Sequence, residues 1–330
     1  MPKIAYVSRG FAADMGSRFR GEQTLACSWR DLVWAAITVG KPRAGHIMRY
    51  GRYSWFECLY RASILHANLA ERNGLFRRTL AYSSLDSTEK GAISYFLGLT
   101  MAKLFAEKVL GVPWLMHLDV YRGQLRALGL EGDARPGLVG LDREGRWVVV
   151  EAKGRTGGLE RDVLAKAKQQ TQQLADIGGS SPRLRIAIAT YFQAGALHVA
   201  WEDPADPLKD AISLDLSPHE LLTEYYRPLL GMLVVQEKVG DLAWVTVGDE
   251  QYRTLHIGEA DLTVGVARFI YEAAAKGPTA LPVAVLEQRR SLARQARRHR
   301  AVGSDGVLVQ VGPLWSKRQM MHEPERRNLG

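Results

Sequence analysis

The chain has 330 residues, of which 46% are hydrophobic and 24% charged, as expected for a globular protein with a sizeable core. Its formal net charge of +9 suits a polyanionic partner, usually nucleic acid, although charge alone fits a merely basic protein equally well. The only two cysteines, Cys27 and Cys58, exclude a disulfide framework and a cysteine-rich zinc site. The N-terminus lacks a signal-peptide core and no apolar run approaches membrane-spanning length, so we expect a cytoplasmic protein without a membrane partner.

Three regions follow one another along the chain. We expect a helical N-terminal region at 1–86, a core at 87–205 and a basic, mostly helical C-terminal region at 206–330. Apolar periodicity predicts N-terminal helices over 29–38 and 54–71.

The core region is predicted to begin with a helix. Asp86 and Glu89 form a capping-box pattern, and apolar residues then recur at helical spacing from Ile93 to Phe105. Gly111 follows, as a helix C-terminal stop.

Alternating and apolar runs predict strands through the rest of the core. The expected elements are strands at 114–121, 137–141 and 146–153, a helix at 159–174, and strands at 184–192 and 196–201. This α-β-β-β-α-β-β order predicts an α/β fold in which a mixed sheet is flanked by helices.

The C-terminal region carries a second capping box, at Ser217 and Glu220, which predicts a helix start. The elements expected after it are a helix to about 235, a hairpin around Trp244 and Tyr252, and helices near 259–276 and 281–300.

The strand at 147–153 ends in an acid and an amine on one face. Alternate strand residues share a face, so Glu151 and Lys153 point the same way and the valines between them point into the core. A metal-dependent phosphodiesterase would use both groups, because carboxylate oxygens bind Mg²⁺ and an ammonium can orient water or stabilise phosphate charge. The backbone carbonyl of Ala152 could supply a further ligand. The alternative is a surface ion pair, worth below ~1 kcal/mol.

The stretch from Arg135 to Asp142, followed by Val148 to Lys153, resembles the PD-(D/E)xK nuclease superfamily. That superfamily includes restriction endonucleases, Holliday-junction resolvases and DNA-repair nucleases, and the resemblance covers roughly a third of the chain. It implies a restriction-endonuclease-like core, a Mg²⁺ or Mn²⁺ ion bound by Glu151, and a first-helix glutamate, Glu89, as a further ligand. It also implies phosphate contacts from the next helix, for which the candidates are Lys166, Lys168, Gln169, Gln170 and Gln173.

The chain departs from the superfamily pattern at Gly137, where that pattern places a metal-binding aspartate. The hairpin register puts Gly137 opposite Glu151, and Asp142 about five residues further along, roughly 15 Å from Glu151, as a turn residue. Asp133 from the preceding loop, or Asp119 from the neighbouring strand, remains a candidate for the second carboxylate.

A basic helical face is predicted near the C-terminus. Helical spacing brings four arginines near one face, namely Arg290, Arg294, Arg297 and Arg298. We favour phosphate contact for them over a solvated face or an acidic partner protein, because the whole chain is basic.

Two functions from different classes remain open. The chain is expected to be a metal-dependent DNA endonuclease of restriction or phage-defence type, if a carboxylate replaces the one missing at Gly137. The alternative is a catalytically inactive, nuclease-like subunit that binds DNA or scaffolds a larger assembly with protein partners.

Overall fold

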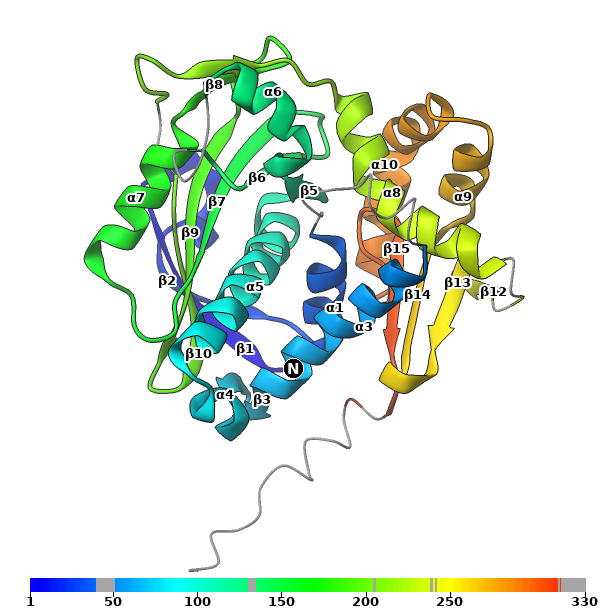
Figure 1. Cartoon of the computed structure of the whole chain (residues 1–330), viewed down its shortest axis with the longest axis horizontal. Coiled ribbons are helices and arrows are strands. Elements are labelled where there is room, and N and C mark those ends of the chain that lie inside the picture. The colour runs from blue at the N-terminus through cyan, green and yellow to red at the C-terminus, as the bar shows by residue number, and fades with distance from the viewer. Residues whose placement is uncertain are drawn as a thin grey trace, which may run out of the picture.

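The computed structural model describes residues 1–39, 51–129, 135–203, 206–237, 240, 242–313 and 315. Figure 1 shows a large sheet with helices on both faces, and a smaller sheet with its own helices beside it. The predicted mixed α/β architecture is therefore confirmed at this coarse level. No helix among the described residues has the length and apolar character that a membrane crossing requires.

The large sheet has nine strands, and its order is β2-β1-β4-β10-β9-β7-β6-β5 with β3 paired to β4. The core contributes β5 (Trp114–His117), β6 (Leu138–Leu141), β7 (Trp147–Gly154), β9 (Leu184–Gln193) and β10 (Ala196–Glu202). β5, β6 and β7 are antiparallel neighbours, and β7 pairs with β9 in parallel. The antiparallel β6–β7 pair is the hairpin that the sequence predicts.

Helices cover both faces of this sheet. On one face lies α5 (Ser87–Phe105), which starts at the predicted Asp86–Glu89 capping box and continues as a π-helical turn, η3 (Ala106–Leu110). Gly111 ends it in the left-handed conformation. On the other face lies α7 (Arg161–Thr171), which packs on alanines of β9 and β10. The parallel β7–β9 pair requires this crossover helix.

Some core elements are shorter than expected. β5 ends at His117 because the chain turns there into a 3₁₀ turn, η4 (Leu118–Tyr121), and then α6 (Arg122–Ala127). A short strand, β8 (Leu174–Ile177), follows α7 and pairs with β11 (Ile212–Leu214).

The N-terminal region contains strands that were not expected. α1 (Trp29–Thr38) has the predicted bounds. α3 (Gly51–Asn68) lies slightly earlier in the chain than the expected range 54–71. Four strands and three short helices surround them, namely β1 (Lys3–Arg9), η1 (Ala13–Met15), η2 (Ser17–Phe19), β2 (Gly21–Ala26), β3 (Leu69–Arg72), β4 (Leu75–Arg78) and α4 (Leu80–Ser84). β1 buries alternate side chains and pairs with β10, so this region extends the core sheet. The prediction of a helical region at 1–86 is wrong to that extent.

The C-terminal region combines helices with an antiparallel sheet. α8 (Pro218–Glu237) starts at the predicted capping box, and the predicted hairpin forms from β12 (Leu242–Val247) and β13 (Glu250–Ile257). The helix expected from 259 begins only at Arg268, because 262–267 form a strand between β13 and β15. The other elements are η6 (Gly258–Ala260), β14 (Leu262–Ala267), α9 (Arg268–Ala275), α10 (Ala280–Arg298) and β15 (Val307–Val311).

Buried polar contacts join α5 to the C-terminal region. Lys103 donates to the hydroxyl of Tyr225 (2.7 Å), and that hydroxyl donates to Asp305 (2.6 Å). The indole of Trp34 also donates to Asp305, at 3.2 Å. Lys103 and Asp305 are both fully buried. This cluster, which we call the Lys103 cluster, ties the two sheets into one packed body.

Candidate functional site

The end of β7 carries the acid and amine that the sequence singles out. The β6–β7 register pairs Leu138 with Val150, so Gly137 lies opposite Glu151 as predicted. Lys153 Nζ lies 2.7 Å from Glu151 Oε1, and the Gly137 N–H donates to Glu151 Oε2 at 2.5 Å. Glu151 is buried, whereas the Lys153 side chain is 31% exposed. Both oxygens of this carboxylate therefore already accept a hydrogen bond or an ion pair from the chain itself.

Glycines let α5 approach this strand end closely. A Cβ at Gly98 would lie 2.9 Å from the nitrogen of Gly154, and a Cβ at Gly154 would overlap the carbonyl oxygen of Ser94. Only glycine permits such a backbone contact. The contact fixes the strand immediately after Lys153. Sequence analysis missed it, although a glycine directly after the acid–amine strand was a visible signal.

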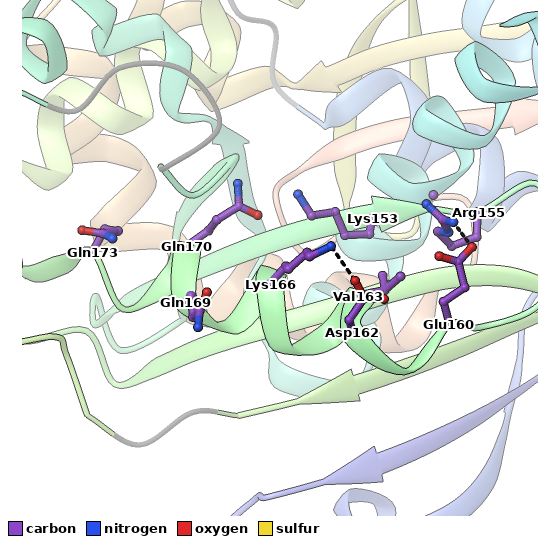
Figure 2. Close-up of a pocket in the computed structure, with 10 residues that line it drawn as sticks. Lys153, Arg155, Glu160, Asp162, Val163, Lys166, Gln169, Gln170 and Gln173 are labelled. Carbon is purple, nitrogen blue, oxygen red and sulfur yellow. Dashed lines mark hydrogen bonds and ion pairs between the residues drawn. The ribbon is translucent and has the colours of Figure 1, made fainter.

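Lys153 lines a hollow of ≈ 640 Å³ between the end of β7 and helix α7, which we call the α7 hollow. The residues that line it are Lys153, Gly154, Arg155, Glu160, Asp162, Val163, Lys166, Gln169, Gln170 and Gln173. Figure 2 shows Lys153 projecting from the strand toward the side where Gln170 projects from the helix. Four of the five predicted phosphate-contacting residues therefore line one concave surface with Lys153.

Ion pairs organise the charges of the α7 hollow. Lys166 pairs with Asp162 one helical turn earlier, and Arg155 pairs with Glu160, as the dashed lines in Figure 2 mark. Arg155, Glu160 and Asp162 were not anticipated from the sequence, since they lie in a loop and a first helical turn with no motif. Such exposed pairs are weak, so a bound anion can replace their carboxylate partners.

Lys168 is the candidate on α7 that does not line the hollow. Its ammonium lies 2.8 Å from Glu202 at the end of β10, on another side of the helix. Gln170 donates to the backbone oxygen of Arg135 at 3.4 Å, which joins α7 to the segment before Gly137.

Asp119 is the described carboxylate that comes closest to the role of a second acid. The N–H of Leu118 donates to the carbonyl of Gly137 at 2.9 Å, which places η4 beside Gly137. Asp119 forms an ion pair with Arg135, and a second one with Arg122 at 3.3 Å. Two arginines thus hold this carboxylate.

Electrostatic effects on Tyr95 connect Asp119 with Glu151. Burial raises the pKa of Tyr95, and the negative charges of Asp119 and Glu151 raise that pKa further. Both carboxylates therefore act electrostatically on the Tyr95 hydroxyl.

The remaining candidate metal ligands form other hydrogen bonds, lie on the backbone of β7, or fall outside the described residues. Glu89 is exposed and accepts the N–H of Asp86 (3.4 Å) in the capping box. Asp142 is fully buried and accepts two backbone N–H groups of its own turn, as predicted for a turn residue. Asp133 lies outside the described residues. Ala152 lies between Glu151 and Lys153 and is half-buried.

These residues do not fit the two-carboxylate magnesium centre that the resemblance implies. Within the described ranges, no group of three or more His, Cys, Asp or Glu side chains is placed to hold a metal ion. Glu151 is the one described carboxylate on the strand end, and its two oxygens already face Lys153 and the Gly137 N–H. Mg²⁺ requires hard oxygen ligands at ~2.1 Å, which this arrangement does not gather.

The C-terminal arginines do form one exposed face. Arg290, Arg294, Arg297 and Arg298 are all exposed on α10, while Leu292 and Ala293 between them are buried. The helix packs on α8 and α9, and Figure 1 shows this helical group at the side of the molecule away from α7. The arginine face and the α7 hollow are therefore separate surfaces.

In comparisons with known proteins, no family model matches the chain, and neither a curated protein nor a solved structure shows significant similarity to it. What can be said of function therefore rests on the geometry of the strand end, the α7 hollow and the arginine face.

Proposed function

We propose that this protein binds nucleic acid with a nuclease-like core and does not cleave it through a two-carboxylate metal centre. The observation that carries the proposal is the state of Glu151, whose oxygens accept from Lys153 (2.7 Å) and from the Gly137 N–H (2.5 Å). Gly137 has no side chain to supply the carboxylate of the superfamily pattern, and its backbone N–H donates to a Glu151 oxygen that a metal would need as a ligand.

Phosphodiester binding is the activity that the remaining groups support. The α7 hollow presents Lys153, Arg155 and Lys166 as cations. Three glutamine amides add neutral donors, and amide and ammonium groups of this kind contact phosphate oxygens without reading base sequence. The net charge of +9 adds long-range attraction for a polyanion. The arginine face of α10 provides a second surface for backbone phosphates.

The experiment compares the native chain with Gly137→Asp, with Gly137→Asn as the uncharged control. Gly137 lacks a positive φ, and a Cβ there would lie 3.1 Å from Glu151 Oε2, so a side chain requires a small shift. We expect the native chain to bind linear DNA without cutting it in Mg²⁺ or Mn²⁺. We expect Gly137→Asp to gain metal-dependent cleavage, together with a melting temperature that rises on metal addition, and Gly137→Asn to gain neither.

Other outcomes would overturn the proposal in distinguishable ways. Metal-dependent cleavage by the native chain that Lys153→Ala abolishes would show that another acid completes an active centre. Absence of DNA binding at low salt would leave the core as a scaffold for protein partners.

A further inference from the structure

A second hollow, of ≈ 310 Å³, lies beside the π-helical turn η3, and we call it the η3 hollow. Four basic side chains line it, together with the single acid Glu107, and these basic residues are Arg18, Lys108, Arg143 and Arg183. They come from η2, η3, the β6–β7 turn and the residue before β9. Because these segments are far apart in sequence, folding and not a charge run gathers the four cations.

The positive charge of the three arginines is only partly neutralised within the described chain. Arg18 forms no ion pair with a described residue, and Arg143 lies 3.4 Å from Glu107. Arg183 lies 3.3 Å from Asp142, whose carboxylate already holds Arg146 at 2.7 Å. Such long, shared contacts leave guanidinium donors available to an anion.

Two buried polar atoms at this hollow have no hydrogen-bonding partner among the described residues. They are Nε of Arg143, a donor, and Oε2 of Glu107, an acceptor, and Glu107 as a whole is only 7% exposed. Glu107 Oε1, in contrast, accepts from the hydroxyl of Ser304 at 2.5 Å. Unpartnered buried polar atoms are rare in folded proteins, so an absent partner should offer both an acceptor and a donor.

We propose that the η3 hollow binds a phosphate group carried by a small phosphomonoester or by the terminal phosphate of a nucleic-acid strand. Phosphate oxygens would accept from the arginines. The ionisable P–OH, present in a substantial fraction near the second phosphate pKa of about 6, would donate to Glu107. A diester within a strand and a sulfate ion lack that hydroxyl. The proposal goes beyond the function proposed above, because this hollow lies at the opposite end of β7 from Lys153.

The test is calorimetric titration of the full chain with inorganic phosphate at pH 6.5 and constant ionic strength, with sulfate as the matched anion. We expect saturable phosphate binding and about tenfold weaker sulfate binding, as for the loss of one hydrogen bond to a charged group. Arg18→Gln and Arg143→Gln should each weaken phosphate binding about tenfold. Arg18 is exposed and forms no ion pair with a described residue, so its substitution breaks no such pair. Lys209→Gln, an equal change of charge at an exposed position outside the hollow, should leave it unchanged.

The source of the phosphate is tested with a 5′-phosphorylated strand and the same strand ending in a hydroxyl. Tighter binding of the phosphorylated strand, lost in Arg18→Gln, assigns the hollow to strand ends. Equal binding of both strands, with inorganic phosphate still bound, assigns it to a free phosphomonoester. Lys153→Gln should weaken strand binding and leave phosphate binding intact, so failure at one hollow is distinguishable from failure at the other. Absence of saturable phosphate binding, or equal binding by all variants, would overturn the proposal.

Discussion

Two amine–carboxylate arrangements in this molecule differ in what surrounds them. In the Lys103 cluster, Lys103 and Asp305 are both fully buried, and the hydroxyl of Tyr225 links them by hydrogen bonds. At the end of β7, the Lys153 ammonium pairs directly with Glu151, and the Lys153 side chain is 31% exposed at the α7 hollow. The first arrangement directs its hydrogen bonds inward, and the second leaves ammonium protons for a ligand.

The contrast teaches how to separate structural from functional charge. A buried pair is costly to desolvate and depends on every partner, so breaking it penalises the fold. A pair at an open strand end contributes little to stability, so its cation can contact a ligand with little penalty to the fold. Substitutions in the Lys103 cluster should therefore lower the free energy of unfolding, whereas substitution of Lys153 should mainly weaken ligand binding.

The largest expected effect is on the Lys103 cluster. Lys103→Met should lower the free energy of unfolding by about 3–5 kcal/mol, because it leaves a buried carboxylate without its cation. The ring of Trp34, whose centroid lies 4.9 Å from the Lys103 ammonium, loses a cation–π contact as well. Urea denaturation followed by tryptophan fluorescence measures the change.

The double variant Lys103→Met/Asp305→Asn serves as the control for that prediction. Removing both charges should restore part of the stability, since the desolvation cost of Asp305 disappears with its charge. A loss below about 1 kcal/mol in Lys103→Met would instead show that the cluster behaves like a surface pair.

The second effect concerns His117, a buried imidazole of the core near the candidate site. Burial, together with the charge of Arg61, lowers the pKa of His117 to about 4. The unfolded chain binds this proton below pH ~6.5 and the folded chain only below about 4, so stability should fall as pH drops through that window, by up to roughly 3 kcal/mol. Urea titrations at several pH values should show this slope in the native chain and not in His117→Gln. If the free energy of unfolding depended on pH in the same way in both proteins, His117 would not be the group responsible.

The third effect tests how α5 fixes the strand end. Gly154→Ala places a Cβ on the carbonyl oxygen of Ser94, and relieving such an overlap typically costs about 1–3 kcal/mol. Gly157→Ala is the matched control, because a Cβ at Gly157 meets no heavy atom within 4 Å. We expect Gly154→Ala also to weaken DNA binding, since Lys153 precedes the displaced residue. Equal melting temperatures for the two variants would show that the contact is unimportant.

How much of this molecule the sequence predicts depends on where the determining contacts lie. Capping boxes and period-two runs are local signals, so α5, β7 and the Gly137–Glu151 register were predicted correctly. β1 was missed because its pairing partner β10 lies far along the chain, and β14 was mistaken for helix because it is apolar and short. The resemblance also anticipated that residues in and just after α7 would lie on one surface with Lys153, as four of them do, but not that Lys168 would pair with Glu202 instead. The arginine partners of Asp119 depend on long-range packing that no local pattern encodes.

The smallest expected change in stability, and the sharpest change in binding, belongs to Lys153→Gln. The Lys153 side chain is 31% exposed, and the buried Glu151 keeps the Gly137 N–H as a donor, so the free energy of unfolding should fall by only about 1 kcal/mol. Loss of one phosphate contact should weaken DNA binding about tenfold and reduce the slope of log affinity against log salt by about 1. Lys209→Gln, which removes an equal charge at an exposed position outside the α7 hollow, should leave that slope nearly unchanged. Fluorescence anisotropy across a salt series measures both proteins. If Lys153→Gln lost much stability while the salt slope stayed unchanged, the Lys153–Glu151 pair would serve to stabilise the fold and not to bind DNA.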